Sequence, residues 1–361
     1  MNYDTTLTDA QLTRMLDLTD PDWQLRDATH VETGHHAVAR IDVETPDGRR
    51  TCYLKATPPG KPASVDPEAR LLAGLDAGTA VPVPSVLGAV DEHGDLPAPY
   101  VLLSTEPGEA RSRTTLPSVS DDELRQIARE TGRDLASLHA VDAVDAYGFL
   151  THDGPALSGG VPPADFSTVA VEDPTTDWRE RLDGWAQDTL VHLEETRFAD
   201  VVPEVEPVLE SRVDAVEGPF EPALARVDQS IENVLVADGD LTAWIDWEFT
   251  VAATPAYDLC CVAWSLAGGP YQFDADVPDR RPLVREALFE GYAAVPARGQ
   301  HAPADVVEQA RANRPCYELL STLRSMEHLE DWFELFDLGD RVDRAASDLR
   351  TELADRLQAG R

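Results

Sequence analysis

The sequence predicts an α+β protein in two parts, with strands gathered towards the N-terminal end and helices filling most of the remainder. Runs of alternating apolar and polar residues over 28–57 predict an antiparallel meander of three strands. Beyond residue 106, apolar residues recur at helical spacing, most clearly over 121–141. A chain of 361 residues is large for a single core. We therefore expect two lobes around a cleft, formed by residues 1–106 and 107–361.

Local signals mark where several elements begin. Thr8 and Gln11 have the spacing of a capping box, which predicts a helix over 8–18. Pro67 suits the first turn of a second helix, and that turn also carries Glu68. The remaining expected elements are strands over 81–90 and 99–108, a Gly-, Pro- and Ser-rich surface loop over 151–176, and helices over 177–198, 204–216, 260–266, 282–292, 305–326 and 341–357.

The stretch 223–259 carries the strongest local signals in the chain. An Asp-Gly pair at 238–239 lies between two short apolar runs, which predicts a β-hairpin. The fold-back would bring Asn233, at the start of the first strand, near Asp246, at the end of the second. An amide oxygen and a carboxylate at that spacing can share a Mg²⁺ ion. Asp228 lies on the loop before the hairpin and could take a proton from a hydroxyl that attacks a phosphate.

The spacing of Asp, four residues, Asn, a hairpin and a second Asp is the layout of a kinase catalytic loop. With the wording NVLV…GDLTAWIDWE…PAYDL, this stretch resembles the aminoglycoside phosphotransferase/choline kinase-like family. Taken alone, it could instead be an ordinary surface hairpin with capping polar residues. The resemblance implies a protein-kinase-like fold, with a small antiparallel-sheet N-lobe and a mostly helical C-lobe. It also implies an enzyme that uses ATP and Mg²⁺ to phosphorylate a hydroxyl of a small molecule, such as an aminoglycoside, choline or a sugar.

The resemblance assigns roles to particular residues. Asp228 would be the catalytic base, and Asn233 and Asp246 would hold Mg²⁺. Lys55 stands in an otherwise apolar strand and would contact the α and β phosphates of ATP, with Glu68 holding it in place. A solvent-facing strand residue is the plainer interpretation of Lys55, but lysine occurs at only one other position in this chain.

Further nucleotide contacts are expected in the first lobe. The turn at 33–36 contains Gly34 and would serve as the phosphate loop, although one glycine is weak support. His35 and His36 could donate to phosphates, but we favour their interpretation as exposed turn residues. The hinge would offer backbone groups to adenine at Leu103, Ser104 and Glu106.

Other residues are expected to support the second lobe. We interpret His139 as structural, near the C-terminus of its helix, where a cation is favoured. Asp258 matches a family aspartate that bonds the backbone of the catalytic loop, which implies a supporting role. An acceptor pocket could be lined by Tyr317, Glu327, Glu330, Asp331 and Trp332, although each alone is more simply core or solvated surface.

The sequence departs from the family just before Asp228. The family usually has His-Gly-Asp there, whereas this chain has Arg226 and Val227. A buried Arg226 could support the loop by pairing with a carboxylate, while Val227 restricts a backbone that glycine leaves free. Glu232 adds negative charge beside the metal site. The departure leaves a second interpretation open, a catalytically weakened kinase fold that binds nucleotide or ligand; a nonenzymatic scaffold is the third.

The composition limits partners and surroundings. The chain carries 67 Asp and Glu against 30 Lys and Arg, a formal net charge of −37, and this acidity is spread along its length. Spread acidity argues against nucleic-acid binding and is typical of a salt-loaded cytoplasm, where screening shortens to ~3 Å at 1 M salt. We therefore expect a halophilic source and a cytoplasmic location, with no signal peptide and no membrane span. The acceptor and the oligomeric state stay open.

The four cysteines show no metal-ligand spacing. Two are adjacent and sit in an apolar run, so we expect small buried hydrophobic residues instead of disulfides. The four positions are Cys52, Cys260, Cys261 and Cys316.

Overall fold

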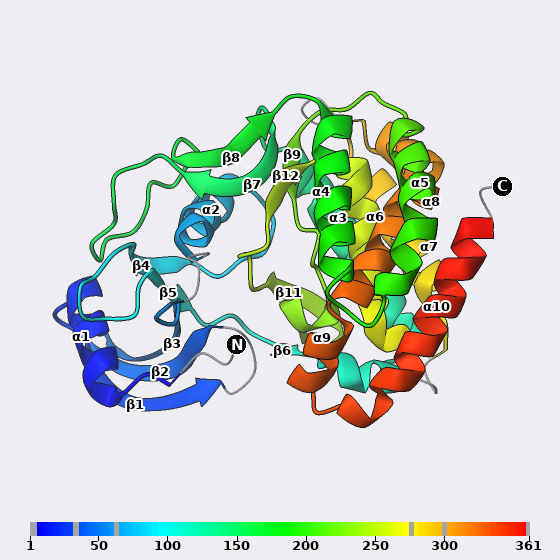
Figure 1. Cartoon of the computed structure of the whole chain (residues 1–361). Helices are drawn as coiled ribbons and strands as arrows, with labels where there is room; N and C mark the ends of the chain where they lie inside the picture. The colour runs from blue at the N-terminus through cyan, green and yellow to red at the C-terminus, as the bar shows by residue number, and fades with distance from the viewer. Residues whose placement is uncertain (1–5, 32–35, 61–64, 274–277, 298–301, 359–361) are drawn as a thin grey trace. The chain divides into compact units, whose positions relative to one another are not determined.

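The fold is α+β, as expected, with an N-terminal antiparallel sheet and a helical C-terminal region (Figure 1). The computed structural model describes residues 6–31, 36–60, 65–273, 278–297 and 302–358. The chain forms two compact units, and we describe each by itself. Unit 1 contains residues 1–108, 150–172 and 242–249, and unit 2 contains residues 109–149, 173–241 and 250–361. The lobes 1–106 and 107–361 remain a prediction; unit 1 also takes in two short segments from later in the chain.

Unit 1 is built on a sheet of five antiparallel strands in the order β1-β2-β3-β5-β4. Its first three strands form the expected meander. The element bounds are α1 (Asp9–Thr19), β1 (Gln24–Val31), β2 (Ala37–Thr45), β3 (Gly48–Ala56), α2 (Val65–Gly78), β4 (Val86–Val90) and β5 (Tyr100–Ser104).

One face of this sheet carries α1. The expected capping box is present, because the Gln11 N–H donates to Thr8 Oγ1 at 3.2 Å and the Thr8 N–H donates to Gln11 Oε1 at 2.9 Å. The apolar side of α1 joins alternate residues of β2 and β3, such as Leu54 and Ala56, in one hydrophobic core. Since side chains alternate along a strand, Lys55 points to the opposite face.

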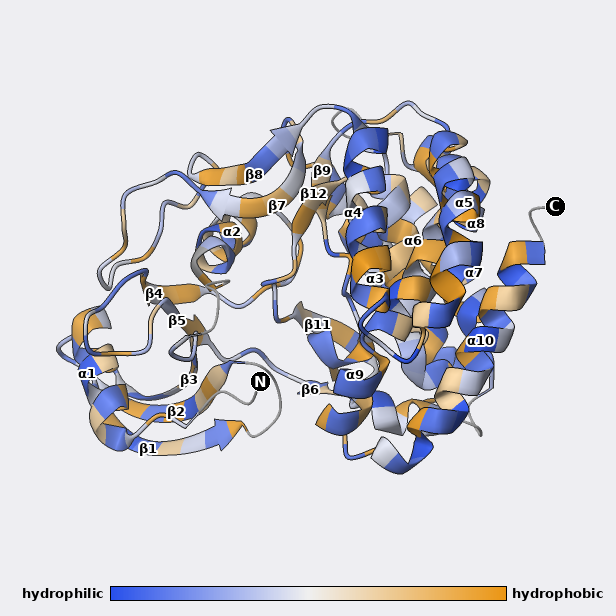
Figure 2. Cartoon of the chain, viewed as in Figure 1, coloured by the Kyte–Doolittle hydropathy of each residue, from blue (hydrophilic) through white to orange (hydrophobic). Residues whose placement is uncertain are grey.

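Helices make up most of unit 2, and short strands complete it. Figure 2 shows hydrophilic and hydrophobic residues interleaved along α3 and α10, as expected of amphipathic helices. The helices are α3 (Asp121–His139), α4 (Trp178–Leu193), α5 (Val202–Asp214), α6 (Pro255–Leu266), α7 (Arg281–Ala293), α8 (Pro303–Glu327), α9 (Leu329–Leu335) and α10 (Val342–Gln358). The strands are β6 (Glu109–Ala110), β7 (Tyr147–His152), β8 (Val169–Thr175), β9 (Ala223–Ala225), β10 (Val234–Ala237), β11 (Asp240–Trp244) and β12 (Val251–Ala253); β7, β8 and β11 run across the boundary between the units.

Two glycines allow α3 and α7 to pack backbone against backbone. A Cβ atom added at Gly132 would lie 2.1 Å from the carbonyl oxygen of Leu288, and one at Gly291 would lie 2.1 Å from that of Arg129. Neither position can accept a side chain unless the helices separate. The close approach fixes α3, which leads from the start of unit 2 towards its interior.

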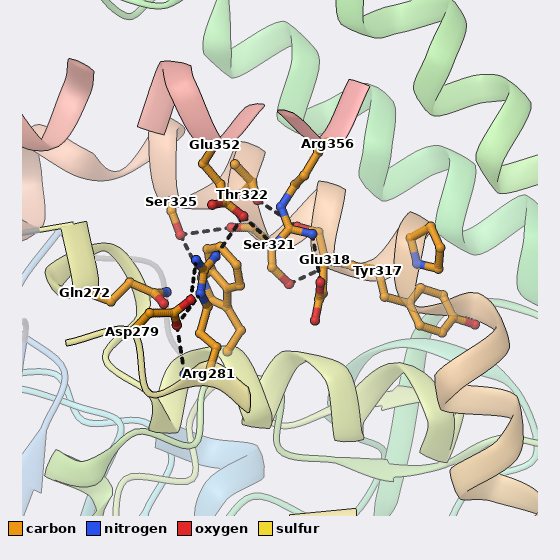
Figure 3. Close-up of polar contacts among 12 residues, drawn as sticks. Gln272, Asp279, Arg281, Tyr317, Glu318, Ser321, Thr322, Ser325, Glu352 and Arg356 are labelled. Carbon is orange, nitrogen blue, oxygen red and sulfur yellow. Dashed lines mark hydrogen bonds and ion pairs between the residues drawn. The ribbon is translucent and has the colours of Figure 1, made fainter. Parts of the chain in front are cut away.

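A polar network ties α10 to α8 and to the start of α7 (Figure 3). Arg281 donates to Glu352 at 2.7 Å, and Arg356 donates to Glu318 at 2.8 Å. Both guanidinium groups also lie over the ring of Trp264, at 5.5 and 5.3 Å from its centroid. These charges are less than one-fifth exposed and each has an opposite partner, so the network holds the last helix in place.

The predicted hairpin is present and one predicted loop is partly wrong. Strands β10 and β11 are joined by Asp238 and Gly239 with φ of 54° and 94°, the left-handed conformations that a tight hairpin turn requires. The loop predicted over 151–176 contains the end of β7 and the strand β8, which pairs with β7. Its Val-Ala-Val run forms a strand despite the surrounding Gly and Pro.

The four cysteines are free and buried, as expected. In the part of the chain that the structure describes, no helix is both long enough and apolar enough to cross a membrane.

Candidate active site

Strand β3 places Lys55 inside a cluster of carboxylates in unit 1. Its Nζ donates to Glu68 Oε2 at 2.9 Å and to Asp246 Oδ1 at 2.5 Å, and lies 3.4 Å from Glu248 Oε2. The Lys55 side chain is 9% exposed. The structure therefore brings together three residues singled out in the sequence, Lys55, Glu68 and Asp246, and adds Glu248.

The cluster has more carboxylates than one ammonium can neutralise. Burial alone would lower the pKa of Lys55, but the carboxylates of Asp246, Glu68 and Glu248 outweigh it and raise that pKa. Burial also raises the pKa of Glu68; Lys55 opposes this rise, while the other two carboxylates add to it. Lys55 is therefore firmly charged, and the surplus negative charge around it favours a further cation.

Glu68 holds two parts of the cluster at once. Its Oε2 accepts from Lys55, and its Oε1 accepts from the backbone N–H of Trp247 at 2.9 Å. The neighbouring Asp246 has φ of 60°, a left-handed conformation that costs energy for any residue except glycine. The carboxylate of Asp246 is 41% exposed, whereas that of Glu248 is 4% exposed. The strained backbone thus turns one acidic side chain outward and the other inward.

The predicted phosphate loop is only partly visible. Gly34 and His35 lie outside the described residues. His36 is buried and pairs with Glu248 through its Nε2. The interpretation of His36 as an exposed turn residue is therefore wrong, because its ring serves as a partner for a buried carboxylate.

The predicted hinge residues lie at the end of β5. Leu103 pairs with Tyr53 and Ser104 with Cys52 in the sheet. The Ser104 N–H donates to the carbonyl of Ser85 at 2.9 Å, and the Ser104 hydroxyl donates to Glu106. Strand pairing between β3 and β5 ends at Ser104, and the backbone towards Glu106 follows it; the contact of Leu103, Ser104 and Glu106 with adenine stays a prediction.

The catalytic loop predicted in unit 2 is braced by its own side chains. Arg226 is buried and donates from Nε and Nη2 to the amide oxygen of Gln229, at 2.9 and 2.6 Å. Gln229 donates to the carbonyl of Asn233 at 3.3 Å, and Asn233 Nδ2 donates to the carbonyl of Asp228 at 3.1 Å. Arg226 therefore supports the loop, as suggested, but this contact is to a neutral amide where we expected a carboxylate.

Glu232 is bound by an arginine that the sequence analysis missed. Arg113 Nε lies 2.7 Å from Glu232 Oε2, and the Arg113 N–H donates to Glu232 Oε1 at 2.9 Å. Arg113 Nη2 lies 3.7 Å from Asp228 Oδ1. Burial raises the pKa of Glu232, and Arg113 opposes that rise. The extra negative charge expected from Glu232 is thus largely compensated by a neighbouring guanidinium.

The residues proposed for an acceptor pocket do not share one location. Trp332 and Asp228 share Arg113 as a neighbour. The Arg113 Cζ is 5.7 Å from the Trp332 ring centroid, and its Nη2 is 3.7 Å from Asp228 Oδ1. Tyr317 is fully buried and accepts from Trp178 Nε1 at 3.2 Å, so it belongs to the core. Glu327 contacts His192, Glu330 contacts Arg197, and Asp331 is exposed.

His139 and Asp258 form a buried pair. His139 Nε2 lies 2.8 Å from Asp258 Oδ2, and its Nδ1 lies 2.9 Å from the hydroxyl of Tyr292. The pair connects α3, α6 and α7, in keeping with a structural role for His139. Asp258 uses its carboxylate on this histidine, where we expected a bond to loop backbone.

Two residues of the site escaped the sequence analysis. Glu248 follows the end of β11 and lies in a turn, after the left-handed Asp246, so strand alternation could not have marked it. Arg113 had no local signal, because it lies far along the chain from Asp228. Within the described residues, no group of three or more His, Cys, Asp or Glu side chains forms a metal site.

The antiparallel sheet and the helical region are those of a kinase-like fold, and comparisons with known proteins agree. Residues 36–304 match the family described as "Phosphotransferase enzyme family", and the chain belongs to this family. The comparison with curated proteins gave no match.

Solved structures show the same fold. Aminoglycoside phosphotransferase APH(4)-Ia is 16% identical with a TM-score of 0.58, over 95% of this chain and 99% of that chain. A thermostable mutant of it, in ternary complex with ADP and hygromycin B, is 16% identical with a TM-score of 0.57, over 94% and 98%. The gentamicin complex of APH(2'')-IIa is 15% identical with a TM-score of 0.55, over 98% and 99%. At these identities the likeness shows the fold alone.

Proposed function

We propose that this protein is an ATP-dependent kinase that transfers phosphate to a hydroxyl of a small molecule. The observation that carries this proposal is the buried Lys55, held by Glu68 and Asp246. A fixed ammonium of this kind suits the α and β phosphates of a nucleotide. The solved structures with this fold add support, since one of them holds ADP beside hygromycin B.

Each unit offers an oxygen donor that supports Mg²⁺ as the proposed cation. Asp246 offers a partly exposed carboxylate, and Asn233 uses the nitrogen end of its amide for its bond to Asp228, which leaves the oxygen end for a metal. Hard oxygen donors of this kind are the ligands that Mg²⁺ prefers. When bound by Asn233 and Asp246, the ion would neutralise charge on the transferring phosphate.

The protein's own residues would bind and orient the reactants. Lys55 would exchange part of its contact with Asp246 for phosphate oxygens, while Glu68 keeps the amine in place. The backbone at Ser104 and Glu106 would meet the adenine edge. Asp228 would orient the acceptor hydroxyl and accept its proton, so most of the rate would come from positioning and electrostatics.

An ATP-consumption screen tests this proposal. The protein, with Mg²⁺ at molar KCl, is offered aminoglycosides, amino sugars, choline, sugars and homoserine. We expect turnover with at least one acceptor. Asp228→Asn should abolish it and leave Mg-ATP binding intact, whereas Asp331→Asn removes the same charge from an exposed position and should change little. Full activity of Asp228→Asn would remove that residue from the mechanism.

A second candidate is a kinase fold that binds nucleotide without transferring phosphate, suggested by Arg226 and Val227. ATP binding without turnover on the whole panel would favour it. The internal bracing of the loop by Arg226 and Gln229 favours the enzyme, because it restores support lost with the family's usual residues.

The acceptor class and the cellular setting also belong to this proposal. Relatives of known structure bind hygromycin B and gentamicin, and an acidic protein would attract such cationic molecules. The halophilic source and the cytoplasmic location stay predictions from the acidic composition. A melting temperature that does not rise with KCl would contradict the first.

A further inference from the structure

Arg113 is a buried arginine of unit 2. It begins a short 3-10 helix (Arg113–Ser118), and its side chain is 9% exposed. Its Cζ lies 5.7 Å from the ring centroids of both Tyr271 and Trp332. A Cβ atom added at Gly269 would lie 3.7 Å from Arg113 Nη1. Rings and backbone from two segments, 269–271 and Trp332 of α9, therefore enclose one guanidinium.

The enclosed guanidinium faces two carboxylates of the Asp228 loop. Glu232 is the close partner, with one oxygen 2.7 Å from Nε and the other bonded to the Arg113 backbone. Nη2 reaches on to Asp228 Oδ1 at 3.7 Å. A planar fork holds two carboxylates in a fixed relative geometry, whereas the donors of a lysine ammonium rotate. Glu232 anchors the fork, and the fork reaches the group that the proposed reaction needs.

The Asp228 carboxylate and the Arg113 guanidinium differ in their exposure to solvent. The Asp228 carboxylate is 37% exposed, so solvent and an acceptor can reach it, whereas the guanidinium behind it is enclosed. The rotameric freedom of an aspartate on a loop decreases with each charged group that lies beside its carboxylate. A fixed positive charge on one side restricts that freedom and orients the carboxylate.

We propose that Arg113 is a positioning residue that fixes the Asp228 carboxylate for phosphate transfer, with Glu232 as its anchor. This inference rests on the proposed kinase function. It also assigns Glu232 a role, since the glutamate holds the arginine that orients the base.

The test compares Arg113→Ala with a matched control, Arg281→Ala. Arg281 is also a largely buried arginine, paired with Asp279 and Glu352 (Figure 3) and lying over the rings of Trp264 and Phe273; among the described residues, these partners belong to other segments than the Asp228 loop. Both changes should lower the melting temperature. Only Arg113→Ala should lower kcat, by about 10²-fold, as expected when a reacting group is misplaced.

The parameters that separate positioning from stability are measured together. The KM for ATP should stay within about twofold in Arg113→Ala, because uniform binding is untouched. Millimolar guanidinium should restore part of the lost kcat in Arg113→Ala and none in Arg281→Ala. Arg113→Lys should recover more stability than kcat, because one ammonium replaces the charge without the fork.

Arg113→Ala leaves Glu232 buried without its partner and could fail to fold. In that case the double variant Arg113→Gln with Glu232→Gln, which removes both charges and keeps similar volumes, is measured in its place. A folded variant with wild-type kcat would overturn the inference. A loss of kcat that Arg281→Ala matches, or that added guanidinium does not relieve, would overturn it too. A wild-type protein without turnover on the whole acceptor panel overturns the proposed function and this inference together, whereas wild-type turnover with an unaffected Arg113 variant overturns this inference alone.

Discussion

Lys55 in unit 1 and Arg113 in unit 2 are both buried cations beside carboxylates, but the two are held differently. Lys55 has three carboxylates within 3.4 Å. Arg113 has one close carboxylate, Glu232, a second at 3.7 Å, and two aromatic rings near its guanidinium. Lys55 is surrounded by several carboxylates that can replace one another as its partner, whereas Arg113 is packed against two aromatic rings and one close carboxylate.

This difference matches what each side chain can do. A lysine ammonium is a compact charge whose donors rotate, so it can release one partner and take another. An arginine fork is planar and keeps the geometry that its surroundings impose. We therefore expect Lys55 to change partners when a nucleotide binds, and Arg113 to keep the same partners throughout. Predictions that separate the two cations follow, from the largest effect to the smallest.

Replacing Lys55 should have the largest effect. Lys55→Met leaves Glu68 and Glu248 buried without their ammonium and should destabilise the fold by about 3 kcal/mol. Loss of the phosphate contact should also lower kcat by about 10²- to 10³-fold. Denaturant melts and ATP turnover at molar KCl measure both. Arg49→Gln is the matched control, because it removes one positive charge from a side chain that is 80% exposed; equal results for the two variants would show that the buried cluster is unimportant.

Removing one carboxylate should matter more around Arg113 than around Lys55. Glu232→Gln takes away the close partner of Arg113 and should cost about 2 kcal/mol. Glu248→Gln leaves Lys55 paired with Glu68 and Asp246 and keeps an amide oxygen that can accept from His36, so it should change stability by less than about 1 kcal/mol. Denaturant unfolding measures the loss in free energy of unfolding for each variant. A larger loss for Glu248→Gln than for Glu232→Gln would contradict the idea that Lys55 has more carboxylates around it than it needs.

The excess of carboxylates around Lys55 should also affect how the stability of the protein depends on pH. The pKa of Glu68 is raised in the folded protein, so the folded state holds its proton more tightly than the unfolded chain. This stabilisation is fully present below the unfolded-chain pKa of the glutamate and is lost as pH rises from there through its raised folded-state pKa. Asp246→Asn removes a carboxylate that raises this pKa and should make the loss shallower. Melting curves across that range, with Asp331→Asn as the control for net charge, give the slopes; identical slopes would contradict the prediction.

Salt should affect the surface and leave the buried clusters almost unchanged. Raising KCl should stabilise the wild-type protein, because the net charge of −37 repels itself less when it is screened. The difference in stability between the wild type and Lys55→Met should change by less than about 0.5 kcal/mol, since buried pairs are poorly screened. Melts at low and molar KCl measure this difference, and a strongly salt-dependent difference would mean that solvent ions reach the cluster.

The sequence predicted the parts of the site that local patterns control. A lone strand lysine, a glutamate in the first turn of the next helix and the Asp238-Gly239 turn all lie where expected. Each is set by a few neighbouring residues, through strand alternation, helix capping or turn geometry.

The parts that could not be predicted depend on distant partners. The favoured interpretation of Tyr317 as a core residue is confirmed, but the aromatic cluster that buries it joins α4, α6 and α8 and could not be predicted from any local pattern. His36 was taken for an exposed residue because its buried partner, Glu248, comes much later in the chain. Strand β8 forms by pairing with β7, although its own surroundings are typical of a loop.

The enclosure of Lys55 has a practical consequence for chemical labelling. Acylating reagents attack neutral, accessible amines, and this amine is charged, enclosed and ion-paired. Lysine occurs at only one other position, Lys61. Dyes or sensor surfaces coupled through lysine would therefore attach at very few points and spare the Lys55 amine and its ion pairs.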